Sequence, residues 1–278
     1  MNTRVLRLQN LIDFCSHLES EEKSAATIEK YLRDVRTFFS FAGEQTITKE
    51  LVISYKKSLI NKYAVRSINS MLASLNNFFT FMGYHECKVK SLRVQRQTYC
   101  KEEKELTKAE YLRLVDAARG QIQINLIMQT ISGTGIRISE LKYFTVESIQ
   151  QGEVVVRCKS KTRVILIPGK LRKRLLDFAK KQGIKKGNVF ITRTGKPLDR
   201  SNIWSKMKRL CESAGVKATK VFPHNLRKLF ARTFYRIEKD IAKLADILGH
   251  GSIETTRIYI MTTGTEHRRK IESLGLVI

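Results

Sequence analysis

The chain reads PHNLRKLFARTF at residues 223–234 and LGHGSIETTRIYI at residues 248–260, and these two segments say most about its chemistry. Pro223 suits the first turn of a helix, because its missing N–H would have no partner there. His224 and Arg227 follow three residues apart, so their side chains lie on one face of that helix. The apolar stripe of this helix lies about a quarter-turn or more away and consists of Leu226, Leu229, Phe230, Thr233, Phe234 and Ile237. We therefore expect the His224–Arg227 pair to point outward from the core, where it could act on a substrate.

Two shorter helices are predicted after this one. The next segment repeats the helical spacing, and Gly249 can end that helix, which places His250 just beyond it. Ser252 can cap a following helix over residues 253 to about 261. Tyr259 lies late in this helix, nine residues after His250. Two histidines, an arginine and a tyrosine in this order suit metal-free cleavage of a phosphodiester.

These segments resemble the tyrosine recombinase (phage integrase) family, and the resemblance covers the C-terminal half of the chain. The family pattern has an arginine in a TG-x-R-x-SEL segment, a lysine on a β-hairpin, H-x-L-R, LGH and a tyrosine roughly nine residues on. The matching segments here are TGIRISEL at 134–141, SKT at 160–162, HNLR at 224–227, LGH at 248–250 and Tyr259. The resemblance implies a mainly α fold with a small β-sheet (α+β). An N-terminal helical, SAM-like core-binding domain would precede a mixed catalytic domain.

Each matched side chain then has an expected role in the attack on a phosphodiester. Arg137 and Arg227 would clamp the non-bridging oxygens, because guanidiniums bind them bidentately and stay protonated. Tyr259 would be the nucleophile and would form a 3′-phosphotyrosine with a free 5′-hydroxyl, as the family resemblance implies. His224 is the candidate general base, with hydrogen-bond donation to the phosphate as its alternative role. His250 would donate to a non-bridging oxygen.

A lysine on a hairpin would protonate the leaving 5′-oxygen. The sequence predicts strands at Glu153–Cys158 and Arg163–Ile167, joined by a tip that bears Lys159 and Lys161. Lys161 lies in SKT, which resembles the catalytic-lysine segment of lambda-type integrases, and we favour it as the acid. Lys159 is the alternative, and otherwise a DNA-binding residue of the turn. Val189–Ile191 is a candidate further strand.

The charge of the chain independently indicates a polyanionic partner. Lys and Arg number 52 against 26 Asp and Glu, which leaves a formal net charge of +26 on 278 residues. Such an excess favours DNA or RNA as the partner, although a ribosome-associated or merely basic protein would share it. The candidate DNA contacts outside the catalytic half are Arg66, Lys90, Arg93 and Arg96. An ordinary solvated charge is the alternative for each of them.

Several classes of protein are disfavoured by the sequence. The five cysteines are odd in number and scattered, which argues against a disulfide framework and a zinc site. No acidic cluster resembles a two-metal nuclease site, and no Gly-rich nucleotide-binding loop is present. We therefore expect no cofactor, no metal, and activity in EDTA. Without a secretory signal or a membrane-length apolar run, we expect a soluble cytoplasmic protein, associated with the nucleoid and not with a membrane.

The organisation of the chain agrees with two domains. The first 83 residues show only helical patterns, including two helices that end in FFSFAG and FFTFMG, and predict a four-helix bundle. Thr107 and Glu110 can form a capping box that starts a new domain. We expect a core-binding domain over residues 1–86, an extended basic linker over 87–105 and a catalytic domain over 106–278.

We therefore expect a site-specific recombinase that cuts and rejoins duplex DNA through a phosphotyrosine intermediate and a Holliday junction. It would serve dimer resolution or the integration and excision of a mobile element. The resemblance implies a homotetramer on two DNA sites, with or without a paired recombinase. The rival functions are a type IB topoisomerase or telomere resolvase, and a non-catalytic DNA-binding accessory factor. The apolar tail after Tyr259 either packs on its own domain or docks on a neighbouring protomer.

Overall fold

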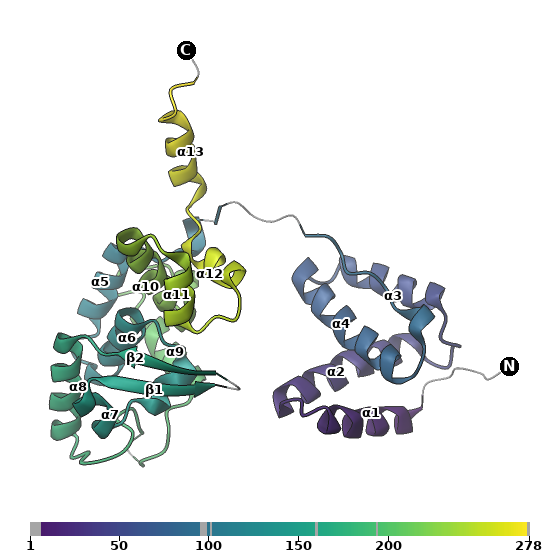
Figure 1. The fold of residues 1–278 in the computed structure, drawn as a ribbon, viewed down its shortest axis with the longest axis horizontal. Helices are drawn as coiled ribbons and strands as arrows, with labels where there is room; N and C mark the ends of the chain where they lie inside the picture. Colours follow the sequence, from purple (N-terminus) through teal and green to yellow (C-terminus); the bar gives the residue numbers. More distant parts are fainter. Residues whose placement is uncertain (1–6, 95–98, 101, 159–160, 193, 277–278) are drawn as a thin grey trace. The chain divides into compact units, whose positions relative to one another are not determined.

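Figure 1 shows the fold in the computed structural model, which describes residues 7–94, 99–100, 102–158, 161–192 and 194–276. The chain divides into two compact units, Met1–Arg96 and Gln97–Ile278. Helices dominate both units, and the C-terminal unit adds one small sheet, so the predicted mainly α fold is confirmed. In the described ranges, no helix is both long and apolar enough to span a membrane.

The N-terminal unit is a bundle of helices, as predicted. Its described helices are α1 (Leu8–Ser20), α2 (Ala25–Ala42), α3 (Lys49–Ile60) and α4 (Val65–Phe81). The phenylalanines of the two similar helix ends pack in one core. Phe38 and Phe79 meet edge to face with ring centroids 5.7 Å apart, and Phe14 meets Phe78 at 5.2 Å. Aromatic contacts of this kind add to the stability that burial provides.

The first part of the predicted linker is ordered against this bundle. After the 3₁₀ turn η1 (His85–Cys87), Val89 is buried. Asn76 pairs with both backbone groups of Val89, with N···O distances of 2.8 and 3.0 Å. Asn69 pairs with Leu92 in the same way, at 2.9 and 2.7 Å. Two amide side chains on one face of α4 thus replace a strand partner, and such pairing leaves no periodic signal in the sequence.

The C-terminal unit surrounds one central helix. Its described elements are η2 (Glu102–Lys104), α5 (Lys108–Ala117), α6 (Ile122–Thr134), η3 (Ile138–Tyr143), α7 (Val146–Gln151), β1 (Glu153–Cys158), β2 (Lys161–Leu166), α8 (Gly169–Lys181), α9 (Arg200–Arg209), η4 (Ala218–Lys220), α10 (Pro223–Glu238), α11 (Ile241–Leu248), α12 (Ile253–Ile260) and α13 (Gly264–Glu272). The apolar helix α6 packs against both α8 and α10. The capping box of Thr107 and Glu110 starts α5 as predicted, with N···O distances of 2.9 and 3.2 Å.

The sheet differs from its prediction in two respects. β1 and β2 pair antiparallel from Glu153↔Leu166 to Cys158↔Lys161, so the backbone of Lys161 belongs to the strand and not to the hairpin tip. Among the described residues the sheet has two strands, and the expected strand at Val189–Ile191 is wrong. One isolated bridge lies just before that segment, at Asn188, and another lies at its last residue, Ile191. Val189 and Phe190 are core residues of an irregular segment, so their apolar character reflects burial and not strand pairing.

Candidate active site

Helices α10, α11 and α12 carry the two segments that the sequence singles out. Pro223 is in the first turn of α10, as predicted. α11 ends at Gly249, whose backbone is left-handed (φ 62°, ψ 46°), and the Ser252 hydroxyl accepts from the Glu254 amide at 3.2 Å to start α12. The buried residues that join the three helices are Ala231, Leu244, Leu248 and Tyr259. Helix caps set these boundaries, and the small shared core sets the position of the tyrosine.

We call the polar cluster beside this core the cationic pocket; it consists of Arg137, Glu140, Arg163, His224, Arg227, His250 and Tyr259. Arg137 precedes η3 and is held at both ends of its guanidinium. One nitrogen donates to Glu140 Oε1 and the other to the Gly249 carbonyl, each at 3.0 Å. Glu140 is buried, and its second oxygen accepts from the Arg137 amide at 2.7 Å. Glu140 therefore orients Arg137 toward the turn that carries His250.

Arg163 is a member of this pocket that the sequence analysis did not single out. It extends from β2, and its guanidinium donates to Glu140 Oε2 at 2.5 Å and to the carbonyl of Ile247. A side chain at Gly249 would place its Cβ 2.8 Å from Arg163 Cδ, at a backbone φ of +62°. The glycine of LGH is thus required both by conformation and by the close approach of Arg163. No spacing rule in the sequence singles out Arg163, because its contacts depend on how β2 meets α11 in space.

Arg227 is buried, with 1 % of its surface exposed, and the expectation that it points outward is wrong. Its guanidinium donates to the carbonyls of Gly135 and Leu248 at 2.5 and 2.6 Å. α11 and α12 pack against α10, and the end of α11 supplies the second of these carbonyls. Burial and the nearby charge of Arg137 lower the pKa of Arg227 to about 10. Arg227 Nε has no hydrogen-bond partner among the described residues.

His250 has a defined tautomer in this arrangement. Its Nε2 lies 2.9 Å from an Arg227 nitrogen, and because arginine has no acceptor, Nε2 must accept. Nδ1 then carries the proton and donates to the hydroxyl of buried Thr256 at 2.9 Å. Burial and the charges of Arg227, Arg137 and Arg163 lower the pKa of His250 to about 4. The ring is therefore neutral at pH 7 and has no spare N–H. Thr256 was not predicted, since a helical threonine carries no distinguishing pattern.

Tyr259 is buried and lies between the two histidines. Its hydroxyl is 3.3 Å from His224 Nδ1, and its ring meets both imidazoles edge-on with centroids 4.8 Å apart. The Arg227 guanidinium lies 5.9 Å from the centre of the same ring. His224 keeps an exposed edge, yet the surrounding protein and the charges of Lys228 and Arg227 lower the pKa of His224 to about 4. A neutral His224 can accept a proton from the phenol.

The remaining predicted residues lie elsewhere or outside the described part. Lys159, Arg96 and the side chain of Lys161 are outside the described residues, so the choice of lysine stays a prediction. Arg66 on α4, Lys90 and Arg93 are exposed on the N-terminal unit. They stay candidate DNA contacts.

The charge of the pocket is unbalanced. The seven residues include three guanidiniums and a single carboxylate, Glu140, which pairs with Arg137 and Arg163. Arg227 instead contacts two carbonyls and the neutral imidazole of His250. Within the described ranges, no three His, Cys, Asp or Glu side chains group so as to hold a metal ion. The pocket has positively charged hydrogen-bond donors in fixed positions, which suits a bound anion.

Known proteins are similar to this chain in sequence and in fold. The model of the phage integrase family matches residues 104–265, and that of the phage integrase N-terminal SAM-like domain matches residues 11–83. Tyrosine recombinase XerA of Pyrococcus furiosus is 29% identical and covers 100% of this chain and 98% of its own length. Tyrosine recombinase XerD of Halalkalibacterium halodurans is 26% identical, covering 91% and 93%.

Solved structures agree. A crystal structure of XerA recombinase is 25% identical, with a TM-score of 0.55, and covers 95% of this chain and 97% of that one. A lambda integrase (75-356) dimer bound to a COC′ core site has the same fold, with a TM-score of 0.75 at 17% identity over 93% and 97% of the two chains. Because a family model covers more than half of the sequence, the chain belongs to the phage integrase family.

Proposed function

We propose that this chain is a site-specific recombinase that cuts and rejoins duplex DNA through a 3′-phosphotyrosine. One observation carries the proposal: the Tyr259 hydroxyl lies 3.3 Å from a neutral His224 in a pocket where guanidiniums outnumber carboxylates. The chemistry needs a nucleophile, a base and a fixed positive charge around one phosphate. The curated relatives are tyrosine recombinases, and the pocket supports the same reaction here.

Arg137 and Arg227 would bind the non-bridging oxygens of the scissile phosphate. Their guanidiniums are already oriented by the carbonyls of Gly249, Gly135 and Leu248. Positive charge that is fixed before the reaction needs no reorganisation when the phosphorus gains negative charge. The two arginines therefore stabilise the transition state more than the ground state.

The covalent step runs from Tyr259 to the phosphate. His224 takes the phenolic proton, the phenolate oxygen attacks phosphorus, and the bond to the 5′-oxygen breaks. Lys161, with Lys159 as the alternative, gives a proton to the departing 5′-oxygen. A 5′-hydroxyl from the partner strand reverses these steps, and because the phosphotyrosine keeps the bond energy, rejoining needs no ATP.

His250 would act in two protonation states. In the free protein its Nε2 accepts from Arg227, which holds that guanidinium in place. A bound phosphate brings negative charge beside the ring and favours the imidazolium. The protonated ring can then donate from Nε2 to a non-bridging oxygen, which is the role expected from the sequence.

The assembly would be a tetramer that joins two duplex sites through a Holliday junction. Solved relatives include a lambda integrase tetramer bound to a Holliday junction and an XerH recombinase bound to its difH substrate. Beyond the first turn of α13, Ile271, Leu274 and Leu276 are at least half exposed, which favours docking of this tail on a neighbouring protomer. The exposed residues Arg66, Lys90 and Arg93 would contact DNA from the core-binding domain, residues 1–86, and from the linker. The protein would act in the cytoplasm, at the nucleoid. Dimer resolution and mobile-element exchange use these same steps.

A selection for covalent complexes tests the proposal. Nicked duplexes with a randomised centre are incubated with the protein in EDTA, and DNA that stays attached in SDS is sequenced. We expect a single consensus sequence, and no adduct with Tyr259→Phe, although its DNA binding persists. Adducts that survive Tyr259→Phe, or that require Mg²⁺, would refute the mechanism. Adducts on unrelated sequences with relaxation of supercoils would indicate a type IB topoisomerase, and binding without adducts an accessory factor.

The choice between the two lysines needs a substrate that requires no acid. A 5′-bridging sulfur leaves without a proton, so it should restore cleavage to the variant that lacks the general acid. We expect Lys161→Ala to lose cleavage of the oxygen substrate and to regain it with sulfur. Lys159→Ala should show this pattern instead if Lys159 is the acid.

A further inference from the structure

The first described residues of the C-terminal unit lie beside the C-terminal end of α12, the helix that carries Tyr259. α12 ends at Ile260, one residue after Tyr259, and the backbone continues in an extended conformation at Met261 (φ −55°, ψ 135°). Cys100 forms a parallel bridge with Thr263, and its amide donates to the Thr262 carbonyl at 2.9 Å. Residues 162 positions apart thus pair two residues beyond the end of the helix.

The side chains of the same segment strengthen this pairing. The Cys100 thiol lies 3.4 Å from the carbonyls of both Met261 and Thr262. Burial raises the pKa of Cys100 to about 11, so the thiol keeps the proton that it donates. The Tyr99 ring stacks on His267 of α13, with centroids 6.3 Å apart.

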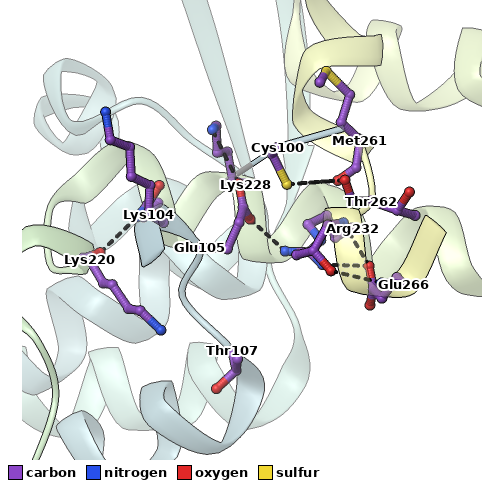
Figure 2. A network of polar contacts seen from close by, with 12 residues as sticks. Cys100, Lys104, Glu105, Thr107, Lys220, Lys228, Arg232, Met261, Thr262 and Glu266 are labelled. Atoms are coloured by element: carbon purple, nitrogen blue, oxygen red, sulfur yellow. Dashed lines mark hydrogen bonds and ion pairs between the residues drawn. The ribbon is translucent and has the colours of Figure 1, made fainter. Parts of the chain in front are cut away.

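An ion network centred on buried Glu105 connects this pairing to α10. Glu105 is 5 % exposed and lies 2.5 Å from Arg232 and 3.5 Å from Lys228, both on α10. Arg232 also lies 3.6 Å from Glu266 in the first turn of α13. Figure 2 shows Arg232 between these two carboxylates, with Cys100 beside Met261 and Thr262. α10 is the helix that carries His224 and Arg227. The network therefore links the helix of the proposed base and phosphate-binding arginine to the segment that follows Tyr259.

We infer that Tyr99, Cys100 and Glu105, which we call the latch, position the catalytic tyrosine. By holding residues 261–266 against Arg232, the latch fixes the C-terminal end of α12 and with it the distance from Tyr259 to His224. This inference rests on the proposed function, since it assigns Tyr259 as the nucleophile. The contacts given above for the latch residues lead to Met261, Thr262, His267 and α10 and not to the pocket residues, so we class them as positioning residues and not catalytic ones.

The test compares two arginines one turn apart on α10. Arg232→Gln removes the link between Glu105 and Glu266, whereas Arg236→Gln removes an equal charge and an exposed contact with Glu266 alone. At saturating protein on the selected nicked duplex, we expect Arg232→Gln to form the adduct at least about tenfold more slowly. A misplacement of 1 Å at a reacting atom can cost roughly 100-fold. Arg236→Gln should stay within about twofold of wild type, because exposed pairs contribute little.

An external nucleophile distinguishes misplacement of Tyr259 from damage to the whole pocket. In a Tyr259→Phe background, hydrogen peroxide supplies the attacking oxygen, and the latch should not matter. Arg232→Gln should therefore leave peroxide cleavage unchanged. Equal slowing of the tyrosine and peroxide reactions would overturn the inference, because the whole pocket would then have changed.

Hydrogen exchange of the free protein tests the same claim without DNA. Arg232→Gln, and the milder Glu105→Gln if the first variant folds poorly, should speed amide exchange over residues 253–260 relative to Arg236→Gln. Equal exchange in all variants would overturn the inference. If wild type forms no adduct, the proposed function fails, and the exchange data still decide whether the latch holds the tyrosine helix.

Discussion

In the N-terminal unit, buried Asp34 has a partner for each of its oxygens, whereas the cationic pocket holds three guanidiniums around the single carboxylate of Glu140. Lys30 lies 2.7 Å and Ser74 2.9 Å from one oxygen of Asp34, and Arg33 lies 3.5 Å from the other. In the pocket, Arg227 is more buried than Lys30 and finds only carbonyls and a neutral imidazole. Each cation of the first network pairs with a carboxylate, whereas among the described residues Arg227 in the pocket has no ion-pair partner.

This difference separates a structural network from a binding site. A buried charge without a counter-ion is unfavourable, and a fold keeps it only when other contacts hold it in place. The carbonyls of Gly135 and Leu248 do this for Arg227. A phosphate would give Arg227 an anionic partner, so the pocket gains more from binding an anion than the Asp34 network could.

The largest expected effect comes from changing the geometry of the pocket charge. Arg227→Lys keeps the charge but cannot hold Gly135 O and Leu248 O while it binds a phosphate. We expect adduct formation at saturating protein to slow by about 10²–10³-fold, as for loss of a preorganised donor. Arg33→Lys, at the exposed edge of the Asp34 network, is the matched control and should change nothing. A loss below tenfold would show that charge alone is sufficient.

The helices of the pocket were predictable because their ends are set by local chemistry. Pro223, Gly249 and Ser252 each occupy the cap position that the sequence indicates. The burial of Arg227 was not predictable, because it depends on α11 and α12 packing over α10. Ile237, expected in the apolar stripe of α10, is 79 % exposed for the same reason: the partners of that helix contact another face.

Two residues that the sequence analysis missed, Arg163 of the pocket and Cys100 of the latch, contact neighbours that are distant in the chain. Arg163 reaches Glu140 and the end of α11, and Cys100 reaches the exit of α12. Neither contact has a spacing rule, since each depends on how elements meet in space. Family resemblance names residues that touch the substrate, whereas these two hold other parts of the protein.

The burial of His250 among the cations of the pocket should also appear in the pH dependence of stability. The pKa of His250 is lowered to about 4 from 6.5 in the folded state. Between these values the unfolded chain binds more protons, so the stability is complete above pH 6.5 and falls as the pH drops toward 4. We expect His250 to contribute up to about 3 kcal/mol to this loss. Urea unfolding between pH 7.5 and 4.5 should give a flatter profile for His250→Gln, and an unchanged slope would contradict this.

Breaking the Asp34 network should cost stability and leave the chemistry intact. Asp34→Asn leaves Lys30 without its charge partner, and because Lys30 is 30 % exposed it can turn to water. We expect a loss of about 1–3 kcal/mol in the unfolding free energy of the N-terminal unit. The only tryptophan, Trp204, lies in the C-terminal unit, so its fluorescence should report an unchanged midpoint while circular dichroism detects earlier unfolding. A slower adduct rate at saturating protein would instead link this network to catalysis.

The smallest effect is expected from the exposed cations, which no structural network holds in place. Arg66 in the first turn of α4 is exposed, and in the proposed function it neutralises one phosphate. Arg66→Gln should make the negative slope of log K against log salt less steep by about 0.9, and it should weaken DNA binding at every sequence alike. The adduct rate at saturation should not change, because Arg66 lies in the other unit from the pocket.

The control for Arg66 is Arg119, which is also exposed but already paired with Asp116. Arg119→Gln removes the same formal charge and should leave the salt slope unchanged, since its counter-ion is a carboxylate and not a phosphate. Equal slopes for the two variants would mean that net charge alone sets DNA affinity. A lower slope for Arg66→Gln alone would show that the position of a surface cation matters as well as its charge. On the surface that position sets the affinity for DNA, whereas in the pocket it sets the rate of adduct formation.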